Sequence, residues 1–285
     1  MNKKVAAIIV TYNRLSDLKT CIDSLKNQST QCHDIIVVNN GSTDGTKEYL
    51  DSLTDIVSIH QDNRGGAGGF YTGQKYMYDN GYEWLWMMDD DGIAHPDQLK
   101  TLLEYANKSG RLFLNALVAS REEPSMMAFI KDRPISDLQN NEIWEDEIHP
   151  FNGTFLHRSI IEKVGFIKKE MFIWGDEQEY KLRIKKAGYI PTTVTHAIHY
   201  HPKEKGVWDI VWPGWINNKI LTKPKKLSKF YYRNLGYLNK TYLRQYPRFC
   251  KDVRHYTLYF IRKFQITELF KFIYYYNKGV NNNYK

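Results

Sequence analysis

The sequence predicts an α/β fold with a doubly wound, mostly parallel sheet, followed by a basic, aromatic helical region. Three observations lead to this prediction. Short apolar runs alternate with helical patterns in the first part of the chain, polar loops follow the apolar runs, and the composition changes after residue 201. With 285 residues, of which 42% are hydrophobic and 25% charged, the chain can form one large domain with a substantial appendage.

The alternation starts near the N-terminus. Residues 5–10 are a continuous apolar run, which is typical of a central parallel strand, and residues 15–27 carry leucine and isoleucine at helical spacing. A second strand is expected at 35–38, followed by a polar turn and a helix, and a third strand at 56–60. This β-α-β-α-β order with short loops predicts a doubly wound parallel sheet, whose ligands bind beyond the carboxyl ends of the strands.

Later segments continue the pattern less regularly. The stretch 61–69 is polar and contains four glycines in five residues, so we expect a close backbone approach to a ligand and a helix that begins after the glycines. Residues 96–107 predict a helix and 112–118 a strand. Residues 121–150 lack periodicity, and we interpret them as a long loop that carries acceptor specificity.

The segment that organises this prediction is an apolar run, residues 84–88, that ends in Asp89, Asp90 and Asp91. Three adjacent carboxylates at the end of a buried strand repel one another unless a cation lies among them. In a continued strand Asp89 and Asp91 would point to one side and Asp90 to the other. We therefore predict a Mg²⁺ or Mn²⁺ site that Asp91 and Asp89 face, against the alternative of a solvated acidic turn.

Two further clusters carry candidate functional groups. An apolar, strand-like run at 171–174 leads into Asp176 and Glu177 at the start of a helix. These acids either complement the helix dipole or supply a general base at the edge of a cleft. In an extended segment near residue 200, His199 and His201 lie on one side, where either can complete the ligand set of a metal ion.

Charge divides the chain unevenly. Residues 202–285 contain 18 Lys and Arg against 4 Asp and Glu, whereas residues 1–201 contain 22 against 28. The basic part also carries aromatic residues at helical spacing, among them Tyr256, Tyr259 and Phe260. We predict helices that lie on an anionic membrane surface or pack on the rest of the chain. The alternative class is a nucleic-acid-binding protein, although no RNA- or DNA-binding motif is present.

With these residues identified, the chain resembles the inverting glycosyltransferases of family 2, which have the GT-A fold, a Rossmann-like α/β fold. The resemblance spans residues 5–201 and is carried by the following motifs: Thr11-Tyr12-Asn13-Arg14, Asn39-Asn40-Gly41-Ser42-Thr43-Asp44, Asn63-Arg64-Gly65-Gly66, Asp89-Asp90-Asp91, Trp174-Gly175-Asp176-Glu177 and the late histidines. Within the family it is most similar to the galactofuranosyltransferases. This implies UDP-galactofuranose as donor and a cell-surface glycan precursor (O-antigen, capsule or cell-wall polysaccharide) as acceptor. The second donor candidate is dTDP-rhamnose.

The resemblance also implies roles for individual residues. The nucleotide sugar would be bound by the following residues: Thr11, Arg14, Asn40, Asp44, Asn63, Gly65, Gly66, Asp89 and Asp90. A Mn²⁺ or Mg²⁺ ion would be held by Asp91, Asp89 and a late histidine, for which His201 is preferred to His199. Glu177 matches the general base, and Asp176 is its rival because the family commonly has Asp at the base position. Trp174 would lie on the acceptor side.

The resemblance sets the expected domains. Residues 1–201 would form the catalytic domain, with nucleotide-sugar binding in 1–92 and the acceptor part in 93–201, and residues 202–285 a helical, membrane-associating or packing region. Three scattered cysteines and the lack of an apolar run of about 18 residues favour a cytoplasmic protein, peripheral at the inner face of the cell membrane. The remaining alternative is a basic nucleic-acid- or membrane-binding protein without catalysis.

Overall fold

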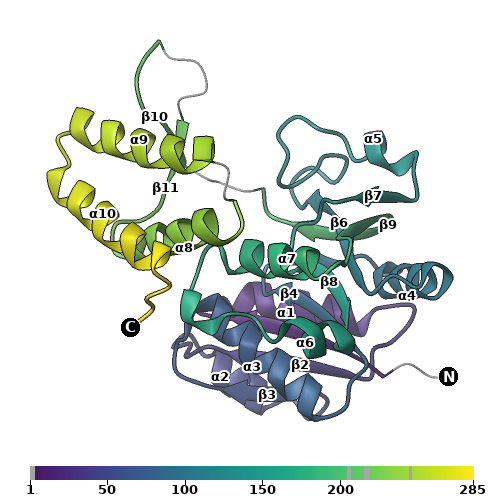
Figure 1. Cartoon of the computed structure of the whole chain (residues 1–285). Helices are drawn as coiled ribbons and strands as arrows, with labels where there is room; N and C mark the ends of the chain where they lie inside the picture. Colours follow the sequence, from purple (N-terminus) through teal and green to yellow (C-terminus); the bar gives the residue numbers. More distant parts are fainter. Residues whose placement is uncertain (1–3, 204–206, 215–218, 244–245) are drawn as a thin grey trace. The chain divides into compact units, whose positions relative to one another are not determined.

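The computed structural model describes residues 4–203, 207–214, 219–243 and 246–285, and Figure 1 shows its helices and strands. The chain divides into two compact units. The first contains Met1–Lys169 and Tyr180–Glu204, and the second contains Glu170–Glu179 and Lys205–Lys285. The division near residue 204 lies close to the boundary expected from charge, but the second unit also takes a short segment from the middle of the expected catalytic domain.

The first unit is built on a nine-stranded mixed sheet, in the order β3-β2-β1-β4-β8-β6-β9-β5, with β7 paired to β9. Strands β1 to β4 run parallel to one another, β8 is antiparallel to β4 and β6, and β6 is parallel to β9. The strands are β1 Val5–Thr11, β2 Asp34–Asn39, β3 Val57–His60, β4 Trp84–Asp89, β5 Ile93–Ala94, β6 Phe113–Ser120, β7 Ile143–Glu145, β8 Asn152–His157 and β9 Thr192–His201. The predicted α/β class with a parallel β-α-β-α-β start is confirmed.

Helices connect these strands. They are α1 Leu15–Lys26, α2 Thr46–Asp51, α3 Gly65–Asp79, α4 Gln98–Ser109, α5 Ser136–Gln139, α6 Arg158–Val164 and α7 Asp176–Lys186, with a 3₁₀ turn, η1, at Lys169–Met171. The two helices with stated bounds, α1 and α4, begin and end within two residues of the prediction. Helix α3 begins at the first glycine of the 61–69 stretch and not after the glycines.

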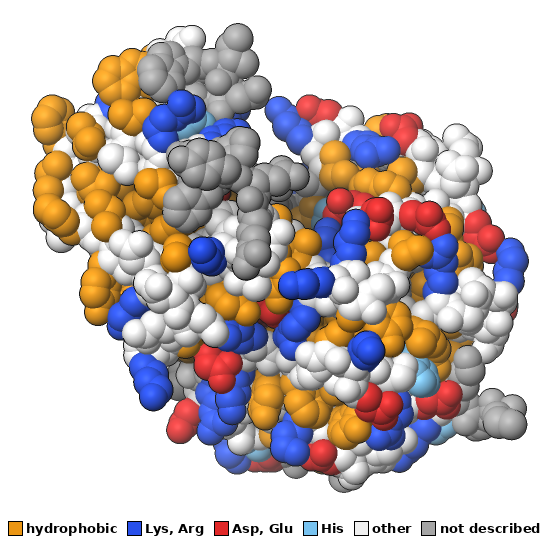
Figure 2. All heavy atoms as spheres, viewed as in Figure 1, with side chains coloured by type: hydrophobic (Ala, Val, Ile, Leu, Met, Phe, Trp, Pro, Cys, Tyr) orange, Lys and Arg blue, Asp and Glu red, His pale blue; other side chains and the backbone are white. Residues whose placement is uncertain are grey.

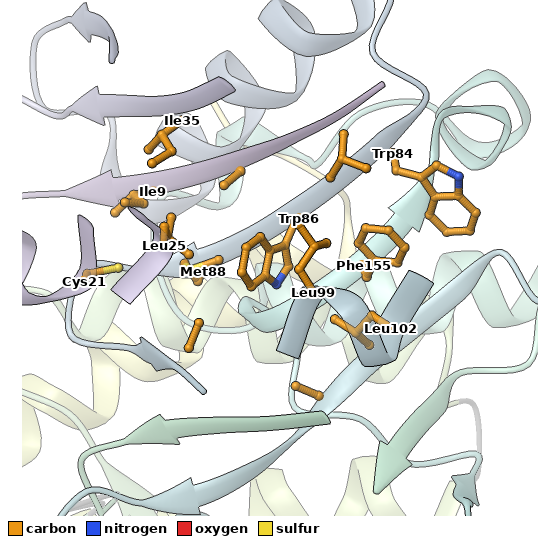
Figure 3. Packing of buried hydrophobic residues seen from close by; sticks show 14 of the residues in the cluster. Ile9, Cys21, Leu25, Ile35, Trp84, Trp86, Met88, Leu99, Leu102 and Phe155 are labelled. Atoms are coloured by element: carbon orange, nitrogen blue, oxygen red, sulfur yellow. The ribbon is translucent and has the colours of Figure 1, made fainter. Parts of the chain in front are cut away.

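Strand β4 lies within an extensive hydrophobic cluster. Trp84, Trp86 and Met88 point to one face, where Trp84 stacks on Phe155 of β8 with ring centroids 4.4 Å apart (Figure 3). The other face is buried as well, because Leu85 and Met87 are also inaccessible to solvent. A strand buried on both faces, as its apolar run predicted, gives the acids that follow it a rigid support.

The glycines of α3 serve packing as well as loop geometry. A Cβ atom at Gly69 would lie 2.3 Å from Cγ1 of Val10, and one at Gly73 would lie 2.6 Å from Cγ2 of Ile8. Both positions therefore let α3 approach β1 closely. The sequence prediction assigned the glycines of the 61–69 stretch, Gly69 among them, to ligand approach and missed this packing role.

Two predicted segments differ in the structure. Residues 121–150 do not form a plain loop, because they contain α5 and β7, and β7 extends the sheet antiparallel to β9. Met127 and Leu138 from this stretch form a small core with Leu117 of β6. Residues 172–175 form no strand, since positive φ angles at Phe172 and Trp174 interrupt an extended conformation.

The second unit contains a hairpin and three helices. They are β10 Val207–Ile210, β11 Lys219–Thr222, α8 Ser228–Thr241, α9 Tyr246–Arg262 and α10 Ile266–Val280. The predicted helical tail is present, whereas the hairpin was not predicted. The core of the second unit is aromatic and includes Tyr232, Tyr256, Phe260 and Phe272. No helix in the described ranges has the length and apolar character needed to cross a membrane.

Candidate active site

The acids at the end of β4 meet the loop that follows the neighbouring strand β1. Asp90 is 4% exposed, and its Oδ2 accepts a hydrogen bond of 2.7 Å from Thr11 Oγ1 and a longer one, 3.4 Å, from the Tyr12 amide. The strand ends at Asp89, so the alternation expected for three acids in one strand does not hold. Asp90 instead turns toward β1 because that loop offers it donors.

Asp91 lies between a histidine and an arginine. Its Oδ1 lies 3.1 Å from Nε2 of His201, which is the last residue of β9, and its Oδ2 accepts from Arg14 Nη1. Arg14 Nη1 also lies 3.3 Å from Asp90 Oδ1 and belongs to a side chain that is 50% exposed. The ends of β1, β4 and β9 therefore bring Thr11, Arg14, the acids and His201 together.

The three carboxylates have different protonation properties. Burial, together with the negative charges of Asp91 and Asp90, raises the pKa of Asp89 to about 8. Burial also raises the pKa of Asp90 to about 6, against the lowering effect of the Thr11 hydrogen bond and of Arg14. For Asp91 burial acts in the same direction, but the hydrogen bond from His201 and the charges of His201 and Arg14 outweigh it and lower the pKa to about 2. Asp91 is thus the most strongly anionic of the three.

The two candidate histidines have different surroundings. His199 is fully buried, with Nδ1 3.3 Å from Gln98 Oε1, and burial lowers its pKa to about 3. Its Nε2 faces Gly92, where a Cβ atom would come within 2.2 Å of that nitrogen. His201, by contrast, contacts Asp91 directly. Of the two, the geometry favours His201 as the partner of the acidic cluster.

Asn40 organises the loop that leads into α3. Its Oδ1 accepts from the Arg64 amide at 3.0 Å and from Gln61 Nε2 at 2.8 Å, and its Nδ2 donates to Gly65 O at 2.9 Å. Asn63 Oδ1 accepts a hydrogen bond of 2.9 Å from the amide of Gly65, the first residue of α3. Asn40 and Asn63 therefore fix the position of the first turn of α3, whose amides point out of the helix end.

Asp44 and Gly66 lie at the same edge of the sheet. Asp44 Oδ2 accepts from the Leu15 amide at 3.0 Å and its Oδ1 from Thr46 Oγ1 at 2.6 Å, so it joins the starts of α1 and α2. Gly66 has open space where a Cβ atom would stand. The hydrogen bonds of Asp44 show how that side chain is held. Binding of a nucleotide by Asp44 and Gly66 stays a prediction.

Arg121 is a contributor that the sequence did not indicate. Its Nη1 donates to Asp91 O at 3.1 Å and to Asp17 Oδ1 at 3.1 Å. Arg121 follows β6, 30 residues after Asp91, in a stretch without periodicity. The pairing of β6 with β9 brings Arg121 next to His201, and the Arg121 amide donates to His201 O. Because His201 also contacts Asp91, only this pairing reveals that Arg121 lies near Asp91 at the end of β4.

The second pair of candidate acids belongs to the second unit. Asp176 is buried at the start of α7, and Glu177 Oε2 accepts a hydrogen bond of 2.9 Å from the Gly175 amide. The ring of Trp174 lies under Nζ of Lys223, 4.8 Å from the ring centroid. The acidic cluster of β4, by contrast, belongs to the first unit.

Within the described ranges, no three His, Cys, Asp or Glu side chains form a ready-made metal cluster. The residues do fit an ion that takes other ligands from a substrate. Two adjacent ligand atoms of an octahedral ion, each about 2.1 Å from it, are about 3.0 Å apart. Oδ1 of Asp91 and Nε2 of His201 already have this spacing, at 3.1 Å.

Comparisons with known proteins agree on the class of this chain. It is 29% identical over 252 residues to galactofuranosyltransferase GlfT1 of Mycobacterium tuberculosis, with 84% of this chain and 83% of the relative covered. It is 27% identical over 208 residues to the dTDP-rhamnosyl transferase RfbF of Shigella flexneri, with 67% and 66% covered.

Among solved structures, it resembles the mannosyltransferase PcManGT of Pyrobaculum calidifontis in complex with GDP-Man and Mn²⁺ (TM-score 0.55, 15% identity, 83% of this chain and 63% of that one covered). This likeness supports the GT-A fold. The sequence profile of the family described as "Glycosyl transferase family 2" matches residues 6–165. Since that match covers more than half of the chain, the protein belongs to glycosyl transferase family 2 and is a glycosyltransferase.

Proposed function

We propose that this glycosyltransferase is metal-dependent and inverting, and that it transfers galactofuranose from UDP-galactofuranose to a hydroxyl group of a cell-surface glycan precursor. The observation that carries the donor is the 29% identity to a galactofuranosyltransferase over 84% of the chain. The similarity to the dTDP-rhamnosyl transferase covers less of the chain, which makes dTDP-rhamnose the second candidate donor.

The donor half of the proposed site lies at the ends of β1, β2 and β4. Arg14 is half-exposed beside buried carboxylates, so its guanidinium can reach a phosphate while Asp90 and Asp91 hold its position. The first turn of α3, fixed by Asn40 and Asn63, directs amide groups outward, and such helix ends bind phosphate oxygens. Together these groups suit a nucleoside diphosphate.

A divalent cation would be held by Asp91 and His201, with Asp89 close enough to Asp91 for the charge of Asp91 to raise the pKa of Asp89. When bound, Mn²⁺ or Mg²⁺ offsets the negative charge that develops on the departing UDP. Arg14 and Arg121 add positive charge at the same end of β4. Arg14 and Arg121 would therefore add to the ion's stabilisation of the negative charge on the leaving UDP.

The acceptor half of the proposed mechanism rests on Glu177. Its carboxylate takes the proton of the acceptor hydroxyl as that oxygen attacks the anomeric carbon from the face opposite UDP. The new glycosidic bond forms while the bond to UDP breaks, and UDP leaves with the electron pair, so a single displacement inverts the anomeric centre. Trp174 would lie beside the acceptor, since its indole ring offers a flat apolar surface.

We also propose that the second unit holds the enzyme at the inner face of the cell membrane. The stripe of Tyr256, Tyr259 and Phe260, which the sequence suggested for this contact, is buried in the core of the unit. Other apolar side chains are exposed around the turn between α9 and α10. They form the α9–α10 corner, which consists of Ile261, Phe264, Ile266, Phe270, Ile273 and Tyr274.

Figure 2 shows hydrophobic side chains gathered at the edge where α9 and α10 lie in Figure 1. Phe264 is 89% exposed and Phe270 68%. The surrounding chain, residues 202–285, carries 18 Lys and Arg against 4 Asp and Glu. Exposed aromatic residues on a strongly basic unit suit the interface of an anionic bilayer.

The experiment that tests the donor and the metal together is a thermal-shift series with UDP, UDP-galactofuranose, UDP-galactopyranose and dTDP-rhamnose, each with and without Mn²⁺. We expect UDP and UDP-galactofuranose to raise the melting temperature, and Mn²⁺ to increase that rise. A rise with dTDP-rhamnose alone would replace the donor and keep the family mechanism. Equal shifts with and without Mn²⁺ would contradict the metal dependence.

A further inference from the structure

The segment between η1 and α7, which carries Trp174 and leads into Glu177, has an unusual backbone. Phe172 and Trp174 have φ angles of +68° and +60°, and Gly175 has +99°. For residues other than glycine, this left-handed conformation costs about 1 kcal/mol or more per residue and persists only where the surroundings enforce it. The contacts of this segment should therefore reveal what holds it.

One side chain collects the carbonyl groups of the segment. Nδ2 of Asn234 donates to the carbonyl oxygens of Met171 at 2.9 Å, Ile173 at 3.0 Å and Trp174 at 2.8 Å. Asn234 is fully buried in α8. An amide group has only two hydrogens for three acceptors, so at least one is shared. A single buried amide thus accounts for the carbonyl groups of most of this turn.

Asn234 belongs to a row of side chains along α8, ending at the C-cap residue Tyr242, that faces the segment and the start of α7. Phe230 stacks on Phe172 with ring centroids 4.3 Å apart, and Tyr242 donates from its hydroxyl group to Glu179 Oε1 at 2.7 Å. The side chain of Leu238 lies 3.2 Å from where a Cβ atom at Gly175 would stand. These positions recur every four residues, which is the spacing of one helix face.

The connection to Glu177 runs through a single peptide group. Asn234 donates to the carbonyl oxygen of the Trp174–Gly175 peptide, and the N–H of the same peptide donates to Glu177 Oε2 at 2.9 Å. Because a peptide group is planar, its carbonyl and N–H directions cannot be set independently. A hydrogen bond at one end also polarises the group at the other.

We propose that Asn234 is a positioning residue for the candidate base: it fixes the Trp174–Gly175 peptide, and that peptide orients the Glu177 carboxylate. This inference rests on the proposed role of Glu177. In this proposal Asn234 acts only through the segment that it holds. The hydroxyl group of Tyr284, 3.2 Å from Asn234 Oδ1, in turn sets the orientation of the amide.

The test compares Asn234→Ala with Asn239→Ala. Asn239 is also buried in α8, but its Nδ2 donates to Asp252 Oδ2 at 2.9 Å and to Tyr276 Oη at 3.0 Å, within the helical part of the unit. We expect Asn234→Ala to lower kcat by about 10- to 100-fold with the donor KM unchanged, because misplacing a catalytic group by about 1 Å has effects of this size. Asn239→Ala should change kcat less than about twofold at a temperature where both variants are folded.

A double-mutant cycle with Glu177→Gln separates positioning from general destabilisation. If Asn234 acts through Glu177, Asn234→Ala should have no further effect on kcat in the Glu177→Gln background. An additive loss, or equal losses in the Asn234 and Asn239 variants, would overturn the proposal. If Glu177→Gln alone kept normal turnover, the assignment of Glu177 as the base would fail instead. Binding of UDP by the Asn234→Ala and Glu177→Gln variants would show that the nucleotide-binding half of the proposed site is intact.

Discussion

Thr11 and Asp90 join the ends of two neighbouring parallel strands through a hydrogen bond of 2.7 Å between Oγ1 and Oδ2. Thr11 ends β1 and Asp90 follows β4, and both side chains are buried. Asp90 therefore relies on Thr11 and on the cationic Arg14 for the stability of its carboxylate. The bond also connects the Thr11–Arg14 motif with the acidic motif, which are 75 or more residues apart in the chain.

We predict that Thr11→Val lowers the free energy of unfolding by about 1–3 kcal/mol, because it leaves a buried carboxylate with one donor fewer. Urea denaturation at neutral pH measures this loss. Thr72→Val is the matched control, since Thr72 Oγ1 donates to the neutral Gln61 Oε1 at 2.8 Å in a less buried position. Equal losses in the two variants would show that Asp90 does not depend on Thr11.

Removal of the proposed metal ligands should weaken Mn²⁺ binding in the presence of UDP. We expect Asp91→Asn and His201→Gln each to lower the Mn²⁺ affinity by at least about 10-fold, because each removes one of two adjacent ligand atoms. Calorimetric titration of the UDP-bound protein with Mn²⁺ measures it. Asp51→Asn, which changes an exposed carboxylate that pairs with Lys47, should leave the affinity unchanged. A full-affinity Asp91→Asn variant would place the ion elsewhere.

The two candidate bases can be separated by isosteric amides. Glu177→Gln should lower kcat by about 10²- to 10⁴-fold, the usual contribution of a general base, while the thermal shift produced by UDP is retained. Asp176→Asn should reduce kcat much less, since Asp176 is buried whereas Glu177 is partly accessible. Steady-state transfer assays with both variants decide the point. The opposite order of effects would assign the base to Asp176.

Acidification should destabilise the folded chain through His149. Burial lowers the pKa of His149 to about 4 from an ordinary value of 6.5, against the raising effect of Glu147 and with the lowering effects of Lys181 and His201. Between these pH values the unfolded chain binds a proton that the folded chain does not, so stability present above pH 6.5 is lost as the pH falls toward 4.

We therefore expect His149→Gln to reduce the loss of stability between about pH 7 and pH 5 by about 1–2 kcal/mol relative to the unmodified chain. Urea denaturation at both pH values measures the difference. His33→Gln serves as a control on a second histidine, whose Nδ1 accepts a hydrogen bond of 3.1 Å from the Val5 amide. An identical pH dependence in the unmodified and His149→Gln chains would contradict the prediction.

Local patterns were sufficient to predict the strands and helices that carry the motifs. The apolar runs that became β1, β2 and β4 are long enough, and their turns polar enough, for the crossovers to follow from sequence. The same patterns placed Thr11, Arg14 and Asp91 after apolar strands, and the structure brings them together with His201, which the sequence placed only in an extended segment. Parallel strands share one carboxyl edge, which makes this part of the site predictable.

Other features depend on pairings between distant segments. The strand β8 pairs antiparallel with β4, in a sheet that was predicted to be mostly parallel. The strand β7 is only three residues long, which is too short for an alternating pattern to be recognised. The left-handed turn at Phe172 and Trp174 is enforced by Asn234, 60 residues after Trp174, and nothing in its own sequence excludes a strand. Contacts of this kind join segments that are far apart in the chain, so no local pattern reveals them.

The exposed apolar side chains of the α9–α10 corner should carry the membrane contact. Phe264 and Phe270 are the most exposed large hydrophobic side chains of this corner, at 89% and 68%. Burying one such side chain is worth about 1.5–3 kcal/mol, so removing both should weaken vesicle binding by at least about 10-fold. Co-sedimentation of the Phe264→Ser, Phe270→Ser double variant with vesicles containing anionic lipid measures the loss.

Four controls separate lipid binding at this corner from nonspecific adhesion and from self-association. Ile190→Ser removes a side chain that is 48% exposed in the first unit and should leave vesicle binding unchanged. Because the basic residues of the second unit should add to the apolar contact, binding should also weaken in high salt and with neutral vesicles. If the double variant bound vesicles normally but changed from dimer to monomer in light scattering, the α9–α10 corner would be a contact between two copies of this chain and not with lipid. Binding to neutral vesicles that does not depend on salt would support the apolar contact and would contradict a contribution from the basic residues.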